Sequence, residues 1–223
     1  MRTVDIAIIG GGAAGMTAAI TAAVRAPEKR ILIIEKNDRL GRKLRATGNG
    51  RCNLTNTACP GYEETIAFFR EIGVQTRVEQ EGRVYPLSGD AADVVEALAA
   101  RVKRLGIEVI CGTACEKVTK TEEGFALDFV KCRKLLIAAG GKAAPAFGTT
   151  GDGTRIAKSL GLSVTRLAPA LTGVETKEDL KSLAGVRTEA EVTLLREGRE
   201  VFREPGEVQF AEYGISGICV MNL

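Results

Sequence analysis

The residues of this chain that could do chemistry are two glycine-rich loops and a carboxylate, all within its first 56 residues. The first loop has the sequence GGGAAG at residues 10–15 and follows an apolar run at residues 4–9. A second apolar run, residues 31–34, ends in Glu35, which lies 20 residues after Gly15. A G-x-G-x-x-G loop after a strand, with an acidic residue about 20 positions further on, is typical of a dinucleotide site.

Each glycine of the first loop has its own expected role. Gly10 permits a tight turn out of the strand, Gly12 lets a pyrophosphate approach the backbone, and Gly15 lets the following helix pack close to the sheet. That helix, expected over residues 13–24, directs N–H groups and the positive end of its dipole at the phosphates. Glu35 would accept hydrogen bonds from a ribose. The alternative is an incidental glycine turn, since such turns are common.

Composition and charge exclude several classes of function. Of the 223 residues, 45% are hydrophobic and 26% charged, as in soluble globular proteins. No apolar run reaches the length of a membrane span, and the first residues lack the pattern of a secretion signal, so we expect a cytoplasmic protein without a membrane partner. A net charge of +3 is too small to indicate a nucleic-acid partner.

The chain contains no histidine. This removes the usual general base and the Ser-His and Cys-His nucleophile pairs, so a cofactor would carry any chemistry near neutral pH. The six cysteines form no C-x-x-C pair, and no metal site is expected. Cys111 and Cys115 are expected to pack as small hydrophobic residues. A redox pair of Cys52 and Cys59 is an alternative that no other residue supports.

A cluster of cations accompanies the two loops and consists of Lys36, Arg39, Arg42, Lys43, Arg45 and Arg51. We interpret this cluster as a solvated loop, or as one that faces a cofactor diphosphate and an anionic substrate. RNA phosphates are the alternative partner.

The remaining sequence pattern places the loops in an α/β domain. Residues 3–9, 13–24 and 31–35 form a strand–helix–strand unit with a right-handed crossover. Further elements are expected as a helix at 62–72, a hairpin at 76–86, an amphipathic helix at 90–105, strands at 107–110, 114–120, 125–130 and 135–138, and a helix from Asp152, as its cap, to about residue 160. The strands at 114–120 and 125–130 resemble the β-meander that covers one face of flavin-binding Rossmann domains.

The character of the sequence changes after Pro169. Apolar and polar residues then alternate, as in strands of an antiparallel sheet, at residues 171–176, 189–196, 200–203 and 207–211. We therefore predict an α/β, Rossmann-like domain with a parallel sheet, helices and a β-meander at residues 1–169. The start of an inserted antiparallel β domain follows at residues 170–223.

The second glycine-rich loop is the most specific motif of the chain. With the LGRKL segment at residues 40–44, the sequence TGNGRCNLTN at residues 47–56 resembles the signature of the BaiN-like family of NAD(P)/FAD-dependent oxidoreductases. Further motifs that match this family are GRVYP at 82–86, AAGGK at 138–142, GTTGDG at 148–153 and GISG at 214–217. The resemblance covers the whole chain.

The resemblance implies that the dinucleotide is FAD, that NAD(P)H is a transient electron donor, and that the partner is a small organic substrate such as an enone or an amine. It places the first loop at the pyrophosphate, Glu35 at the ribose, the backbone near Cys115 at the adenine, and residues 47–53 beside the ribityl chain and flavin ring. The residues expected to bind the cofactor are Gly10, Gly12, Ala13, Ala14, Gly15, Glu35, Lys36, Lys43, Thr47, Gly48, Asn49, Gly50, Arg51, Cys52, Asn53, Cys115, Ala139 and Gly140.

The residue types of the second loop are consistent with that role. Gly48 and Gly50 would let backbone N–H groups approach a planar ring, and the amide and guanidinium side chains of the loop could stabilise negative charge on a reduced flavin. A surface loop with asparagine turns is the alternative. The sequence assigns no catalytic acid or base, and Tyr85 and Arg51 are the polar groups to inspect first.

Members of the BaiN-like family are nearly twice as long and return to the Rossmann-like domain after the inserted domain. This chain stops inside that insertion, so we expect a fragment, a truncated protein, or a chain completed by a partner. The first hypothesis is an FAD-dependent oxidoreductase or its N-terminal part. The second is a flavin-binding protein without turnover. The third is an RNA-associated flavoprotein, which only the clustered arginines support.

Overall fold

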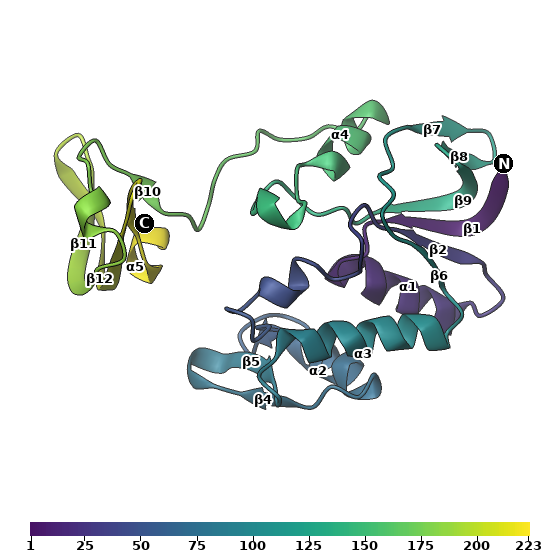
Figure 1. Cartoon of the computed structure of the whole chain (residues 1–223), viewed down its shortest axis with the longest axis horizontal. Helices are drawn as coiled ribbons and strands as arrows, with labels where there is room; N and C mark the ends of the chain where they lie inside the picture. The colour runs from purple at the N-terminus through teal and green to yellow at the C-terminus, as the bar shows by residue number, and fades with distance from the viewer. The chain divides into compact units, whose positions relative to one another are not determined.

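The computed structural model describes all 223 residues. The chain divides into two compact units, Met1–Val164 and Thr165–Leu223 (Figure 1). This division falls a few residues before the predicted boundary between residues 169 and 170.

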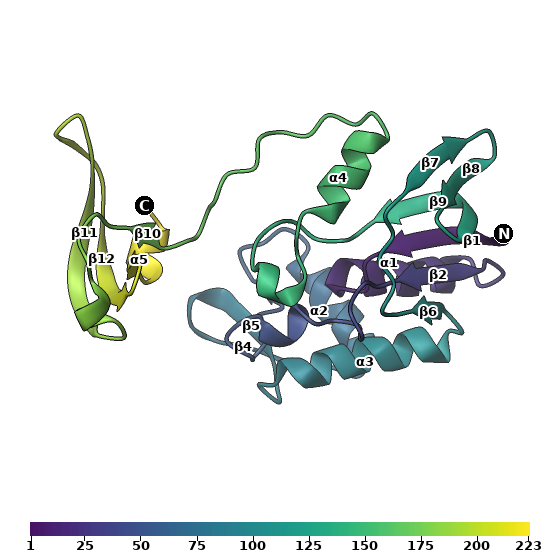
Figure 2. The ribbon, with the colours of Figure 1, turned by 45° about the horizontal axis from the view of Figure 1, so that its top comes forward.

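The larger unit is built on a six-stranded sheet with the strand order β6-β2-β1-β9-β8-β7. Its strands are β1 (Arg2–Ile9), β2 (Ile31–Ile34), β6 (Glu108–Ile110), β7 (Val118–Thr121), β8 (Gly124–Leu127) and β9 (Val130–Ile137). Strands β6, β2, β1 and β9 run parallel, and β8 and β7 continue the sheet as antiparallel neighbours (Figures 1 and 2). All four residues of β2 are buried, as expected for a strand whose two faces are both covered.

Helices cover the two faces of this sheet. The helices of the larger unit are α1 (Ala13–Arg25), α2 (Tyr62–Glu71), α3 (Ala91–Arg104) and α4 (Asp152–Ser159). On one face, Met16 of α1 and Leu98 of α3 share a core with Ile33. On the other face, Ile156 of α4 packs in a second core with Ile9, and this core also receives side chains from β7 and β8. The predicted α/β Rossmann-like fold is confirmed, including its β-meander.

A smaller sheet with the order β3-β5-β4 lies between β2 and α3 in the sequence. Its strands are β3 (Thr55–Asn56), β4 (Thr76–Val78) and β5 (Arg83–Pro86), and short 3₁₀ helices occur at Leu44–Ala46, Gln80–Gly82 and Pro145–Phe147. Phe69 and Ile72, at the end of α2, join the core beneath α1 and α3. The predicted helix and hairpin of this region are both present.

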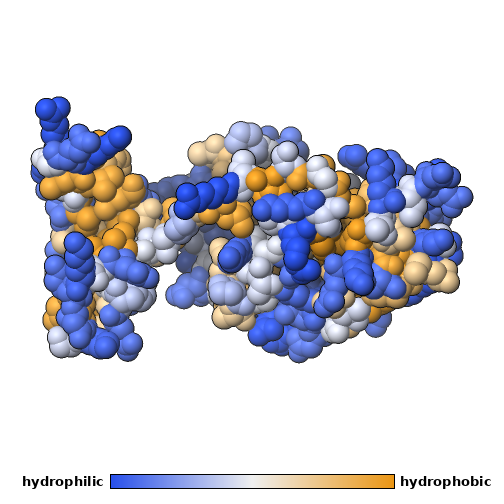
Figure 3. All heavy atoms as spheres, turned by 90° about the horizontal axis from the view of Figure 1, so that it is seen from above, coloured by the Kyte–Doolittle hydropathy of each residue, from blue (hydrophilic) through white to orange (hydrophobic).

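The smaller unit is a four-stranded antiparallel sheet with the order β10-β13-β12-β11. Its elements are β10 (Val174–Glu175), a 3₁₀ helix (Lys181–Leu183), β11 (Arg187–Arg196), β12 (Arg199–Ala211), β13 (Gly214–Ser216) and α5 (Ile218–Met221). Its core is small and consists of Val208, Cys219 and Val220 with two partly buried neighbours. Apolar side chains such as Val186 and Phe202 stay exposed, and Figure 3 shows an apolar patch on one face of this unit.

Two predicted strands of the smaller unit are in fact one. Residues 200–203 and 207–211 both belong to β12, which pairs with β11 through Pro205 opposite Glu191. A proline cannot donate a ladder hydrogen bond, but it is tolerated where a strand has an open side. Strand β13 reaches only Gln209–Ala211 of β12, which leaves that side open at Pro205.

Three details of the larger unit also differ from the prediction. Residues 114–117 are not a strand, because the N–H groups of Glu116 and Lys117 donate to the carboxylate of Asp128 instead of to a neighbouring strand. The predicted strands at 125–130 and 135–138 are divided differently, since β8 ends at residue 127 and β9 begins at residue 130. Asp152 does not cap α4, because Gly151 holds that position and the Asp152 carboxylate bonds to other side chains.

None of the helices is long and apolar enough to cross a bilayer.

Candidate functional site

A cavity of about 440 Å³ lies at the carboxyl ends of β1, β2 and β9. The strand ends contribute Ile9, Ile34 and Ala138 to its walls, and the first turn of α1 and residues 147–150 complete them. Ligands of open α/β sheets bind outside the carboxyl ends of the strands, and their cavities commonly measure about 300–1,000 Å³. The cavity therefore has the place and the size of a small-molecule site.

The first glycine loop forms one wall of the cavity by letting three elements approach closely. Gly10 has φ 108°, and a Cβ atom there would meet the carbonyl oxygen of Ala138 at the end of β9. A Cβ atom on Gly15 would meet the carbonyl oxygen of Gly10. A side chain at either position would therefore push β1, β9 and α1 apart.

Gly12 differs from these two glycines because its Cβ position is open. No atom lies within 4 Å of that position, and Gly12 lines the cavity. Gly12 is also the N-cap of α1 and makes no side-chain capping bond. The N–H groups of the first helical turn, next to Ala13 and Ala14, therefore face the cavity without a side-chain acceptor, as at helix ends that bind anions.

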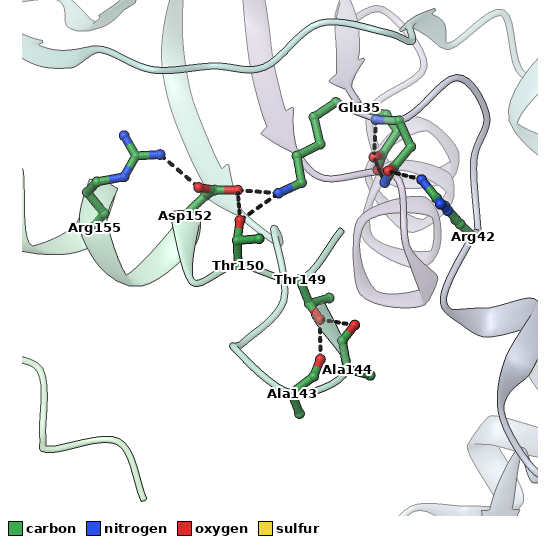
Figure 4. A network of polar contacts seen from close by, with 10 residues as sticks. Glu35, Arg42, Ala143, Ala144, Thr149, Thr150, Asp152 and Arg155 are labelled. Carbon is green, nitrogen blue, oxygen red and sulfur yellow. Dashed lines mark hydrogen bonds and ion pairs between the residues drawn. The ribbon is translucent and has the colours of Figure 1, made fainter. Parts of the chain in front are cut away.

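Glu35 is held rigidly at the end of β2. It is only 7% exposed. One carboxylate oxygen accepts a 2.7 Å bond from the Gly11 N–H group, and the other accepts bonds from the backbone and side-chain nitrogens of Asn37 at 2.8 and 2.6 Å. The Arg42 guanidinium donates to the side-chain oxygen of Asn37 at 3.1 Å (Figure 4). These bonds fix the carboxylate at the cavity wall.

A second polar network, centred on Asp152, also lines the cavity. The Lys36 ammonium group donates to Asp152 at 2.5 Å and to the Thr150 hydroxyl at 2.9 Å, and Arg155 donates to the other oxygen of Asp152 at 2.7 Å (Figure 4). The hydrogen bond from Lys36, followed by that from Arg155, lowers the pKa of Asp152 from 3.8 to about 2. Asp152 is therefore a carboxylate at any physiological pH.

Two further predicted residues, Lys43 and Cys115, also line the cavity. The ammonium group of Lys43 donates to the carbonyl oxygen of Ala143 at 3.4 Å. This hydrogen bond joins the loop after β2 to the loop after β9. Cys115 is buried, and burial is the main reason why its pKa rises to about 11. Its thiol is therefore protonated and behaves as a small apolar group.

The structure brings most of the predicted cofactor residues together around the cavity, and the others do not line it. The predicted residues that line it are Gly10, Gly12, Ala13, Ala14, Glu35, Lys36, Lys43, Thr47, Cys115, Ala139 and Gly140. Those that do not are Gly15, Gly48, Asn49, Gly50, Arg51, Cys52 and Asn53. Except for Gly15, they all belong to the second glycine-rich loop.

Of the second loop, Thr47 lines the cavity, Cys52 is buried in the protein, and Asn49 and Asn53 are exposed. Left-handed backbone at Gly48, Asn49, Gly50 and Cys52 coils the loop tightly. Cys52 is buried in the core under α1 and α3. In the orientation that satisfies its hydrogen bonds, the Asn53 amide nitrogen donates to the carbonyl oxygens of residues 55 and 84. The role of these residues beside a flavin ring stays a prediction.

Arg51 and Tyr85, the two polar groups considered for catalysis, contact each other. The Arg51 guanidinium lies 4.1 Å from the centre of the Tyr85 ring and donates to Glu79 at 2.5 Å. Such stacking with an ion pair is a common way to hold an arginine. Neither residue lines the cavity.

More than half of the residues that line the cavity were not among the predicted cofactor-binding residues. They include Asn37, Phe147, Thr149, Thr150, Asp152 and Arg155, and also Arg42, which was expected only as a member of the basic cluster. The GTTGDG motif at residues 148–153 was a usable signal, because a glycine-rich loop that leads into a helix often lies at a ligand.

Comparison with known proteins places this chain in a family. Residues 4–62 and 60–194 match the model described as the HI0933-like protein Rossmann domain. The chain belongs to the HI0933-like family. The resemblance to BaiN-like proteins found in the sequence is thereby confirmed.

Two curated relatives carry different names. The 3-dehydro-bile acid delta(4,6)-reductase of Clostridium scindens is 37% identical over 98% of this HI0933-like chain and 59% of its own length. The ribosomal RNA dihydrouridine synthase of Escherichia coli is 31% identical over 100% of this chain and 61% of its own length. The chain thus spans about three fifths of the curated relatives it matches.

A solved structure shares the fold of this HI0933-like chain. An open conformation of a flavocytochrome c3 fumarate reductase aligns with a TM-score of 0.52 at 15% identity, over 71% of this chain and 40% of that one. At this identity the match supports the fold alone.

Proposed function

We propose that this chain binds FAD in the cavity and is the cofactor-binding part of an FAD-dependent oxidoreductase. One observation carries the proposal: the open Cβ position of Gly12, the uncapped start of α1 and the fixed carboxylate of Glu35 all border one cavity. These are the features that a dinucleotide requires at its pyrophosphate and its ribose.

The residues present fit the dinucleotide end of the cofactor. The first turn of α1 would hold the pyrophosphate through its N–H groups, and no acidic residue in that turn would repel it. Glu35 would accept hydrogen bonds from the adenosine ribose, while the apolar environment of Cys115 suits a base. Arg42 and Lys43 line the cavity without a carboxylate partner, so they would offset the charge of the phosphates.

The names of the relatives support a reduction. Each name denotes the reduction of a carbon–carbon double bond in a ring. The ring belongs to a bile acid in the first name and is the uracil of ribosomal RNA in the second. FAD supplies hydride transfer when it is bound. We therefore propose a substrate with a carbon–carbon double bond conjugated to a carbonyl group, and a small organic enone as the first candidate. NAD(P)H would be the transient electron donor.

Uracil within RNA is the second candidate substrate. Two curated relatives are named ribosomal RNA dihydrouridine synthase. Of the basic cluster, Lys36, Arg45 and Arg51 form ion pairs. Arg39, Arg42 and Lys43 form none and are the cations that could contact RNA phosphates.

The first test is the visible absorption spectrum of the purified chain with added FAD, recorded before and after anaerobic addition of NADPH. Retained flavin bands that bleach would support the oxidoreductase. Retained bands that do not bleach would support the alternative of a flavin-binding protein without turnover. Absence of retained FAD would refute cofactor binding by this chain.

Reoxidation of the reduced protein distinguishes the two proposed substrate classes. Reoxidation by a cyclic enone, but not by a uridine-containing ribosomal RNA fragment, would support the small-molecule proposal. The reverse result, with RNA binding that weakens steeply with salt, would support the second candidate.

A further inference from the structure

Residues 141–151 form a closed loop between β9 and α4, which we call the strap. The N–H group of Gly151 donates to the carbonyl oxygen of Gly141 at 3.1 Å, so the two ends of the strap meet. Inside the strap, the Thr149 hydroxyl lies within hydrogen-bonding distance of the carbonyl oxygens of Ala143 and Ala144 (Figure 4). Compact loops with closed ends and internal bonds behave as units, and they are frequently functional.

The strap is flanked by glycines with left-handed backbone and has little buried surface. Gly140, just before it, and Gly151, at its end, both have left-handed backbone, with φ 74° and 86°. Residues 141–146 are exposed, and Thr149 is the one buried residue of the strap. Little apolar contact therefore holds the strap in place, and its polar contacts decide where it lies.

The polar side-chain contacts between the strap and the rest of the unit come from the segment after β2 and, through the Thr150 hydroxyl, from Asp152 at 3.0 Å. Lys36 bonds to Thr150 and to Asp152, the first residue after the strap. Lys43 bonds to the carbonyl oxygen of Ala143. The cavity lies between these two segments, and Phe147, with residues 148–150, forms part of its wall.

We propose that the strap closes over the cavity, that the Lys36–Asp152 ion pair latches it, and that opening of this latch sets the rate at which the dinucleotide leaves. The proposal rests on the dinucleotide binding proposed above. The two side chains are 29% and 24% exposed, so water screens this pair less than a surface pair.

The variant Asp152→Asn distinguishes a latch from a direct electrostatic effect of Asp152 on the dinucleotide. The substitution removes a negative charge from the cavity wall, and a direct electrostatic effect would make an anionic dinucleotide bind more tightly. Loss of the latch would instead make FAD leave faster, by about tenfold, the factor that corresponds to about 1.4 kcal/mol. The sign of the change in the dissociation rate therefore separates the two explanations.

The experiment has one arm that needs no cofactor. Trypsin is added to the FAD-free chain, and cleavage after Lys142, within the strap, is followed by mass spectrometry. We expect Asp152→Asn and Lys36→Met to raise the cleavage rate at this bond about tenfold. Lys158→Gln, which removes an exposed charge from α4 away from the latch, should leave it unchanged. Cleavage after Arg133, inside β9, reports unfolding of the whole unit.

The second arm measures FAD dissociation from the same variants by stopped-flow fluorescence. Faster release from Asp152→Asn, with recovery in the charge-reversed pair Lys36→Asp and Asp152→Lys, would support the latch. Slower or unchanged release, or cleavage after Lys142 that rises only together with cleavage after Arg133, would overturn it. If the parent chain retains no FAD, the proposed function fails, and the trypsin arm alone decides whether the ion pair latches the strap.

Discussion

Replacement of Gly12 by alanine should separate cofactor binding from folding. Gly12 has φ −80° and ψ −168°, a backbone conformation that any residue adopts, and no atom lies within 4 Å of its Cβ position. The new methyl group would therefore project into the cavity without disturbing the protein. The free energy of unfolding should change by no more than about 1 kcal/mol, through altered helix capping and chain entropy.

The methyl group would occupy the place where a pyrophosphate must approach the first turn of α1. Loss of one hydrogen bond between a charged phosphate and a backbone N–H group costs about 1.5–3 kcal/mol. At 1.4 kcal/mol per tenfold change, the dissociation constant for FAD should rise about 10- to 100-fold. Equilibrium titration, followed by flavin fluorescence, measures this change.

Gly141→Ala is a matched control. Gly141 also has an open Cβ position and no left-handed backbone, but it does not line the cavity. Its variant should bind FAD as the parent does. If Gly12→Ala also keeps the affinity of the parent, with an unchanged melting curve, the pyrophosphate does not pass over Gly12, and the first turn of α1 is not the phosphate site.

Three further predictions follow from the same structure. Gly15→Ala should lower the free energy of unfolding by about 1–3 kcal/mol, because the new methyl group would overlap the carbonyl oxygen of Gly10; urea unfolding measures this loss. The pKa of Asp152 is lowered in the folded chain from 3.8 to about 2, so its contribution to stability is present above pH 3.8 and is lost as the pH falls toward 2. The difference in unfolding free energy between the parent and Asp152→Asn should therefore shrink over that pH range. A difference that stays constant would contradict the ion pair. Iodoacetamide at pH 8 should label the exposed Cys59 quickly and the buried Cys115, whose pKa is about 11, only after unfolding. Mass spectrometry of the labelled peptides measures this order, and early modification of Cys115 would contradict the prediction.

The sequence predicts one wall of the cavity because that wall is local in the chain. A strand, a glycine loop, a helix and a second strand that ends in Glu35 can fold in only a few ways, and chirality selects one of them. The positions of Gly10, Gly15 and Glu35 follow from this unit. The opposite wall comes from residues 147–155, and only the pairing of β9 with β1 brings these residues to the cavity.

The second loop shows why residue types alone do not predict orientation. Its asparagines, arginine and glycines suit a cofactor, and the same types suit a tight turn. The left-handed backbone at residues 48–50 and 52 turns Cys52 into the core and leaves Arg51 stacked on Tyr85. Whether such a loop binds a cofactor or forms a tight turn depends on the neighbouring elements α3 and β5, and the composition of the loop alone does not predict it.

The hydrogen bonds on Glu35 come entirely from this chain, namely from Gly11 and Asn37. The carboxylate and the glycine loop therefore lose their conformational freedom when the protein folds, before any ligand arrives. A ligand that enters such a preorganised wall does not bear the entropic cost of ordering it, and more of its contact energy appears as affinity. The Gly11 amide hydrogen, which Glu35 shields, should consequently be among the slowest to exchange with solvent in the loops of the larger unit.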